Sequence, residues 1–353
     1  MQKRYGPARL FLELAYDEAQ GGSKDDPRRS ISTLLLNDYA LETEDADLLK
    51  KYSDYKWQPD RLGTEFLDLA PDLENMGWYC YNAAEDSMKR AATEQDKDAR
   101  TKTYGQANRQ YQRSLRYMRL VYDIREKNLP KLDPALILTR AGYGLVLMKN
   151  GIYRDASESM EGSVDSLQKL AGLEKTRREE NAQHSVLPQS PNASWLAETI
   201  VLPGGADLPT LYMVLAQNYY WAAGESEATC KDAAAKHAKL DACKTAEDQL
   251  ISAVREEAHA ATIWQQLWPE HPLANTTLNR LAEIVSEIGN VYRVENRIDE
   301  ADGLAAVVKR TQQVASKPGA RSLQDYAELL RLTGSAAEAS NLLNARSQTV
   351  PTH

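Results

Sequence analysis

The sequence predicts an all-α protein built from repeated helical hairpins, and three observations support this. Ala, Leu, Tyr, Glu, Lys, Arg and Gln dominate the composition and only two of the 353 residues are Phe, a mixture that favours helix over strand. A pattern recurs five times in which a small residue and, three positions later, a large apolar residue precede a polar turn and an Ala. The chain is also long for one globular core, whereas stacked hairpins bury their faces only against neighbours.

The recurring pattern is plainest in the two copies that contain Gly144 and Gly289. These glycines are small enough for two antiparallel helices to cross closely. A break follows at Gly151 in the first copy and at Asn296 in the second, because both residue types tolerate a positive φ. The second helix of each copy then carries an Ala toward the first helix. We therefore expect a tight helix-turn-helix unit at each copy.

This pattern resembles the tetratricopeptide repeat family, whose consensus places Gly and Tyr three residues apart on a first helix and an Ala early in the second. The family's Trp is absent, because Arg140 and Val285 occupy its place in the two plainest copies. The resemblance implies a superhelix whose first helices line a concave groove for a protein or peptide partner. Three further segments match the template less fully: residues 76–80 with Ala107 and Tyr111 on the return helix, residues 215–219, and residues 326–330 with Gly334 and Ala339.

The copies are spaced irregularly along the chain. Their small residues are Gly77, Gly144, Ala216, Gly289 and Ala327. The intervals between them are 67, 72, 73 and 38 residues, and only the last approaches the roughly 34 residues of one tetratricopeptide unit. We therefore expect elongated repeats over residues 70–353, with a polar bridge at residues 93–98 and insertions at about 174–209 and 224–243.

The repeat pattern fades before residue 70, where we expect an N-terminal helical cap over residues 1–69. Residues 8–16 form an apolar stretch, and a second helix is predicted to begin at Pro27 after Asp26 as its N-cap. A short third helix is expected at residues 45–52. Such a cap would cover the apolar end of the first repeat, as terminal units of solenoids must.

The cysteines bear on the compartment. Cys230 and Cys243 flank an Ala- and Lys-rich extension, whereas Cys80 lies at an expected packing position. A disulfide between Cys230 and Cys243 would stabilise the fold by roughly 3 kcal/mol in the chain-entropy model, and the alternative is two free thiols. The disulfide indicates an oxidising compartment. We therefore expect a periplasmic or outer-membrane-associated protein, with a cytoplasmic protein as the alternative.

Charge and hydropathy bear on the class of partner. The formal net charge of −8 and the pI near 5.4 argue against nucleic acid as a partner. The longest apolar stretch, residues 135–148, is interrupted by polar residues and falls below the roughly 20 residues of a spanning helix. We expect no direct membrane span, and the sequence leaves open a removed export signal or lipid anchor.

Motifs of enzyme chemistry are missing from the sequence. It contains no nucleophile elbow, no zinc-protease motif, no phosphate loop and no dinucleotide fingerprint. His237 is the one His near a cysteine pair, and the chain has no C-x-x-C, which argues against zinc. The sequence therefore predicts a protein that is not an enzyme and that needs neither cofactor nor metal.

An arginine ladder is the first candidate for a binding surface. Arg109, Arg113 and Arg116 are spaced four and three residues apart, so that they share one face of a predicted helix at residues 104–125. Guanidinium groups in such a row can hold an acidic peptide or the carboxylate of a sugar. The alternative is that they pair with neighbouring carboxylates at the surface.

A run of three aromatic residues is the second candidate. Consecutive helical positions at 219–221 span about 200°, so these side chains cannot all face the core. Tyr219 matches the core Tyr of the resembled family. This leaves Tyr220 and Trp221 as residues that would contact a partner.

Together these observations predict a non-enzymatic scaffold or adaptor that binds a protein or peptide, within an envelope-associated assembly of bacteria. The alternative is a carbohydrate-binding or carbohydrate-active protein on an α/α helical scaffold. That alternative requires carboxylates that converge from separate helices, roughly 5 to 10 Å apart.

Overall fold

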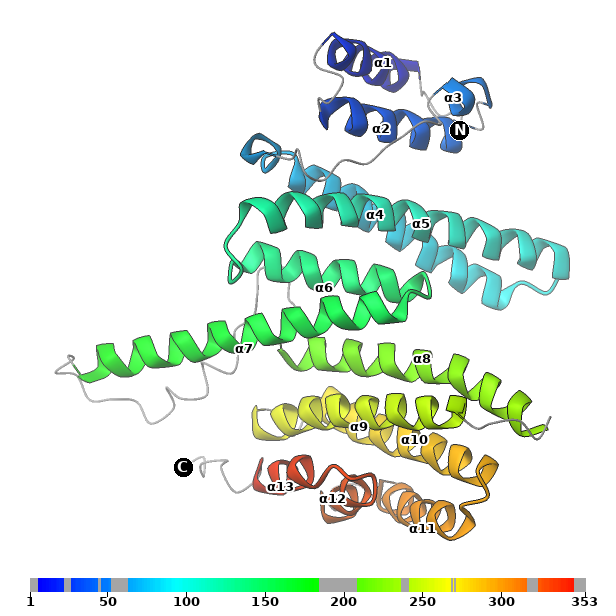
Figure 1. Ribbon diagram of the computed structural model, residues 1–353, viewed down its shortest axis with the longest axis vertical. Coiled ribbons are helices and arrows are strands. Elements are labelled where there is room, and N and C mark those ends of the chain that lie inside the picture. Colours follow the sequence, from blue (N-terminus) through cyan, green and yellow to red (C-terminus); the bar gives the residue numbers. More distant parts are fainter. Residues whose placement is uncertain are drawn as a thin grey trace. The chain divides into compact units, whose positions relative to one another are not determined.

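The computed structural model describes residues 6–21, 27–43, 46–51, 63–183, 208–235, 241–267, 269, 271–315 and 323–345. These residues form helices joined by turns, with no strand among them, which confirms the predicted all-α class (Figure 1). The chain divides into two compact units, Met1–Pro130 and Lys131–His353. The predicted N-terminal cap, residues 1–69, and the first long hairpin both belong to the first unit.

Unit 1 begins with three helices and a short 3-10 turn, followed by a long hairpin. These are α1 (Gly6–Gln20), α2 (Pro27–Thr43), α3 (Ala46–Lys51), η2 (Thr64–Phe66), α4 (Ala70–Thr93) and α5 (Lys97–Asn128). The predicted polar bridge is the turn between α4 and α5, where the side chain of Asp96 accepts a hydrogen bond from the Ala99 amide at 2.7 Å. This N-cap satisfies one of the free amides at the start of α5.

The core of unit 1 joins the cap helices to the hairpin. Ile31 and Leu34 of α2 pack in one cluster with Leu73 of α4 and with Tyr117 of α5. Gly77 lies at the crossing of α4 and α5, where a Cβ atom would come within 2.8 Å of the Met118 sulfur. The close approach of these long helices therefore depends on the missing side chain at residue 77.

Unit 2 contains the remaining helices. They are α6 (Pro134–Lys149), α7 (Tyr153–Gln183), α8 (Leu208–Ala235), α9 (Asp241–Leu267), α10 (Pro272–Val294), α11 (Ile298–Ala315), α12 (Leu323–Leu332) and α13 (Ala336–Ala345). The expected insertions are partly helical: residues 174–183 continue α7 and residues 224–235 continue α8. The rest of the first insertion, residues 184–207, lies outside the described residues.

Three hairpins of unit 2 share one turn geometry. In α6–α7 the Gly151 amide bonds to the Met148 carbonyl at 3.0 Å, the Ile152 amide bonds to the Leu147 carbonyl at 3.0 Å, and Gly151 has a φ of 74°. This is a Schellman motif, which ends a helix with a left-handed residue. The same bonds recur in α10–α11 around Asn296 (φ 63°) and in α12–α13 around Gly334 (φ 77°). The turn chemistry predicted from the sequence is therefore present at all three positions.

The crossing predicted at Gly144 is also tight. A Cβ atom at this position would lie 2.7 Å from the Met160 side chain and 3.3 Å from the Ala156 carbonyl oxygen. Ala156 is fully buried, as expected of the small residue that the second helix turns toward the first. Gly289 is less constrained, because its nearest such neighbour, the Ala301 carbonyl oxygen, would be 3.7 Å away.

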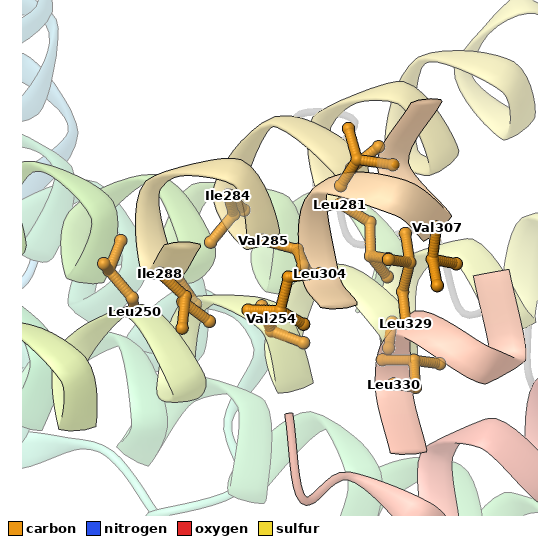
Figure 2. Close-up of a cluster of buried hydrophobic side chains, with 14 of the residues drawn as sticks. Leu250, Val254, Leu281, Ile284, Val285, Ile288, Leu304, Val307, Leu329 and Leu330 are labelled. Carbon is orange, nitrogen blue, oxygen red and sulfur yellow. The ribbon is translucent and has the colours of Figure 1, made fainter. Parts of the chain in front are cut away.

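A continuous hydrophobic core runs from α8 to α13 (Figure 2). The last hairpin also packs against a helix that is distant in sequence, because α13 contacts α9 as well as α12. Side chains of α13 therefore meet those of a helix some 70 to 100 residues earlier in the chain. The core residues labelled in Figure 2 are Leu250 and Val254 of α9, Leu281, Ile284, Val285 and Ile288 of α10, Leu304 and Val307 of α11, and Leu329 and Leu330 of α12.

Candidate functional site

A cavity of about 520 Å³ lies within unit 2 and is lined by residues of the start of α7, the second half of α8 and α10. Cavities of this size hold small molecules or single side chains. It contains Tyr220 and Trp221, the two aromatic residues that the sequence predicts to contact a partner. The lining residues are Tyr153, Tyr220, Trp221, Gly224, Glu225, Glu227, Ala228 and Glu287.

Residues just before the aromatic pair fix α8 against its neighbours. The side-chain oxygen of Gln217 accepts a hydrogen bond from Arg280 of α10 at 2.8 Å. The buried side chain of Asn218 donates to the Tyr153 carbonyl oxygen at 3.1 Å and to the Ser157 hydroxyl at 2.7 Å. Because the Asn218 bond ends on the backbone of Tyr153, the first turn of α7 is held at the cavity wall.

The three consecutive aromatic residues have different neighbours, as their positions on one helix require. The Tyr219 hydroxyl donates to a carboxylate oxygen of Glu161 on α7. Tyr220 packs partly against the core of unit 2 and also lines the cavity. Trp221 carries a cation on its ring, because the Lys149 ammonium lies 5.2 Å from the ring centroid. This distance is within the range of a cation–π interaction.

Gly224 lines the cavity without contributing a side chain to it. It lies in the interior of α8, yet a Cβ atom at this position would meet no heavy atom within 4 Å. Packing therefore does not require glycine here, in contrast to Gly144. The missing side chain leaves space directly beside the aromatic pair.

Carboxylates dominate the polar lining of the cavity. Glu225 is exposed, Glu287 is half-buried and Glu227 is only 9% exposed. Burial raises the pKa of Glu227, the hydrogen bond from Lys231 opposes this shift, and the charge of Glu287 adds to it. The Lys231 ammonium lies 3.3 Å from Glu227 and its side chain is 60% exposed. The cavity is thus acidic, with its most buried carboxylate near a second one.

The predicted arginine ladder belongs to unit 1, so the two predicted sets of binding residues lie in different units. Arg109 is exposed. Arg113 and Arg116 instead face Asp38 of α2, with N–O distances of 3.5 and 3.6 Å. Asp38 is 2% exposed and Arg113 is 14% exposed. Arg113 is therefore largely covered and pairs with a carboxylate of the chain itself, because α2 lies over this face of α5.

A second group of carboxylates was not found from the sequence. Glu161 of α7, Glu256 of α9 and Glu338 of α13 come together because α13 packs on α9. Burial, followed by the charges of Glu161 and Glu338, raises the pKa of Glu256 to about 7, while Arg255 opposes the shift. His259 lies 4.0 Å from Glu338, and burial lowers its pKa. The members are distant in sequence, and no local pattern joins them.

The predicted cysteine pair lies near the cavity. The sulfur atoms of Cys230 and Cys243 are 2.10 Å apart, the distance of a disulfide, and both residues are buried. The pair joins the last turns of α8 to the first turn of α9. Cys80, the third cysteine, is buried in unit 1 and takes no part in this pair.

Metal-binding clusters and membrane-spanning helices are the remaining features that would indicate a function. Among the described residues, no group of three or more His, Cys, Asp or Glu side chains is arranged to hold a metal ion. None of the helices in the described ranges is long and apolar enough to cross a membrane.

Comparisons with known proteins give no family for this chain. No protein-family model matches it, and no curated protein matches it.

Proposed function

We propose that this protein is a non-enzymatic adaptor that binds a segment of a partner protein in the cavity at Tyr220 and Trp221. One observation carries the proposal: an aromatic cavity of about 520 Å³ whose walls are held in place by hydrogen bonds between α7, α8 and α10. Aromatic side chains in a preformed concavity are typical anchors of protein interfaces. The resemblance of the hairpins to tetratricopeptide repeats supports the same class of function.

The cellular setting of the adaptor is part of this proposal. The cysteine pair at disulfide distance supports an oxidising compartment, and we propose the bacterial periplasm or the outer membrane. There the protein would join components of an envelope-associated assembly. The acidic net charge and the acidic cavity support a protein partner over nucleic acid.

The adaptor function is tested by affinity capture from the source organism with three baits. Wild type and Trp221→Ala are compared with Tyr79→Ala, which removes an aromatic side chain that is 75% exposed in unit 1. We expect a partner that the wild type and Tyr79→Ala retain and that Trp221→Ala loses by about tenfold or more. Direct binding of the purified partner must then show the same order. Equal capture by all three baits would exclude the cavity as the binding site.

A carbohydrate-active function is a second candidate, and the carboxylate group around Glu256 favours it. Glycosidases use a pair of carboxyl groups, one of which has a raised pKa and acts as the acid. Glu256, with its pKa of about 7, lies near Glu161 and Glu338, and Tyr219 donates a hydrogen bond to Glu161. Release of reducing sugar from an oligosaccharide panel by the wild type, abolished in Glu256→Gln, would support this candidate.

A further inference from the structure

We propose that the Tyr220–Trp221 cavity receives a basic side chain of the partner, and that it favours Arg over Lys. This inference rests on the adaptor function and specifies the chemistry that the cavity recognises. It follows from the charges at the cavity wall, from the aromatic faces, and from the cation already present on one of them.

The first step concerns the balance of charge. Three of the eight lining residues are carboxylates, Glu225, Glu227 and Glu287, and none of the eight is Lys or Arg. Three cations lie close by, Lys231, Lys149 and Arg280, and the charge of a fourth carboxylate, Glu283, also acts on the lining residue Tyr220. Lys231 pairs with Glu227 at 3.3 Å, and the Lys149 ammonium lies over Trp221. The cavity and its immediate surroundings therefore hold fewer cations than carboxylates, which favours the entry of a positive group.

The second step concerns the most buried carboxylate. Glu227 is 9% exposed, and the like charge of Glu287 adds to the cost of ionising it. Glu287 itself accepts a hydrogen bond from the Asn290 side chain at 2.9 Å, which supplies a neutral donor and no counter-charge. A guanidinium group between Glu227 and Glu287 would remove their repulsion and give both a charge-assisted hydrogen bond.

The third step concerns the aromatic faces. The Lys149 ammonium, 5.2 Å from the Trp221 centroid, shows that this ring accepts a cation in the folded protein. Tyr153 and Tyr220 add two further aromatic walls. Because guanidinium is planar, it can stack on a ring while its edge bonds to a carboxylate, and an ammonium cannot do both in this way. This is the reason to expect Arg over Lys.

The chemistry of the cavity disfavours the other occupants. An acidic peptide would place carboxylates against Glu225, Glu227 and Glu287, which repel it. A neutral sugar would stack on the rings but would leave the carboxylates without a counter-charge. The experiment below tests the acidic class directly with a peptide that contains Glu.

The test uses fluorescein-labelled heptapeptides of a Gly-Ser host that contain two Arg, two Lys, two citrulline or two Glu residues, titrated with the full-length protein. Citrulline has the shape of Arg without its charge. We expect the Arg peptide to bind about tenfold more tightly than the citrulline peptide, with Lys between them and Glu weakest. Raising NaCl from about 0.05 to about 0.5 M should reduce the preference for Arg.

The variants locate the preference in the cavity. The double variant Glu227→Gln and Glu287→Gln should bind Arg and citrulline peptides within about twofold of each other. The control Glu328→Gln changes a half-exposed carboxylate of α12 that pairs with Arg310 at 2.6 Å, and it should keep the full preference. Far-ultraviolet circular dichroism verifies that each variant is folded.

Two results would overturn the proposal. One is equal affinity of the wild type for the Arg and citrulline peptides, and the other is an Arg preference that the double variant retains. Either result leaves the adaptor function standing if Trp221→Ala still loses its captured partner. Equal partner capture by all three baits would instead remove the adaptor function, and the inference with it.

Discussion

Asp38 of unit 1 and Glu227 of unit 2 are both buried carboxylates, but their charged neighbours differ. In unit 1, Asp38 is 2% exposed and faces two guanidinium groups, those of Arg113 and Arg116. In unit 2, Glu227 is nearly as buried, yet it meets one flexible Lys and a second carboxylate, Glu287. The first arrangement neutralises the acid within the chain. The second leaves acidic groups in an open cavity, where a partner can neutralise them, and this difference separates a structural ion pair from a candidate binding site.

The largest expected effect on stability concerns the ion pairs of Asp38 in unit 1. Asp38→Asn removes the buried carboxylate that faces the Arg113 and Arg116 guanidinium groups, and it should lower the free energy of unfolding by about 3 kcal/mol. Urea denaturation measures this change. The control in the same unit is Asp86→Asn, which removes an exposed pair with Lys89 at 3.8 Å and should change stability by less than about 0.5 kcal/mol. Equal effects of the two substitutions would show that Asp38 is not an internal counter-ion.

The cysteine pair gives the next largest effect and concerns the wall of the open site. Replacing both Cys230 and Cys243 by Ala should lower the free energy of unfolding by about 3 kcal/mol, because the closed loop no longer restricts the unfolded chain. Intact mass after alkylation under denaturing conditions, without reductant, should show one modified thiol, that of Cys80. Three modified thiols would contradict both the disulfide and the proposed compartment.

A third carboxylate, Glu256, should make the stability of the protein depend on pH. Its pKa is about 7 in the folded protein, whereas the ordinary glutamate pKa of 4.5 applies to the unfolded chain. The folded protein therefore holds this proton more tightly, and the unfolding free energy should fall as pH rises from about 4.5 to 7, then level off. Glu256→Gln should stabilise the protein by about 1 to 2 kcal/mol at pH 8 and have little effect at pH 4.5.

The measurement for Glu256 is thermal unfolding at both pH values. Glu328→Gln, at a half-exposed site with an arginine partner, serves as the control and should show no such gain at pH 8. A Glu256→Gln variant that is destabilised equally at pH 4.5 and pH 8 would mean that neither burial nor repulsion from Glu161 and Glu338 disfavours the ionised side chain.

Two glycines of unit 2 differ in their surroundings, one lying at a filled helix crossing and the other beside open space. Gly144 lies at a filled crossing, where a Cβ atom would come within 2.7 Å of Met160, so Gly144→Ala should destabilise by roughly 1 to 3 kcal/mol. Gly224 faces open space, so Gly224→Ala should stabilise by about 0.5 to 1 kcal/mol through helix propensity. Chemical denaturation compares the two, and a loss of stability at residue 224 would argue against an open cavity wall.

Local chemistry explains which features could be predicted from the sequence. The turns at Gly151, Asn296 and Gly334 depend on a few neighbouring residues, and all three have the expected left-handed backbone. The cysteine pairing followed from residues only 13 positions apart. The different neighbours of residues 219, 220 and 221 also follow from local geometry, because consecutive side chains on a helix point in different directions.

Long-range packing explains what the sequence could not reveal. Arg113 has the spacing of a surface residue, and its partner Asp38 lies on a helix 75 positions earlier. The charges of Glu161 and Glu338 both act on Glu256, and α13 brings Glu338 close by packing on α9, an arrangement that a simple row of hairpins does not predict. In each case the missing information is which distant helix covers a given face.

The link between α8 and α9 also bears on how tightly the cavity can hold a ligand. Cys230 follows Glu227 by one helical turn, so a covalent tie at this point restrains the segment that carries two of the acidic walls. A ligand entering walls that are already in place loses less conformational freedom than one that must order them. The disulfide therefore favours binding by holding the cavity walls in place before the ligand arrives. Reducing it should weaken binding chiefly through faster dissociation of the ligand.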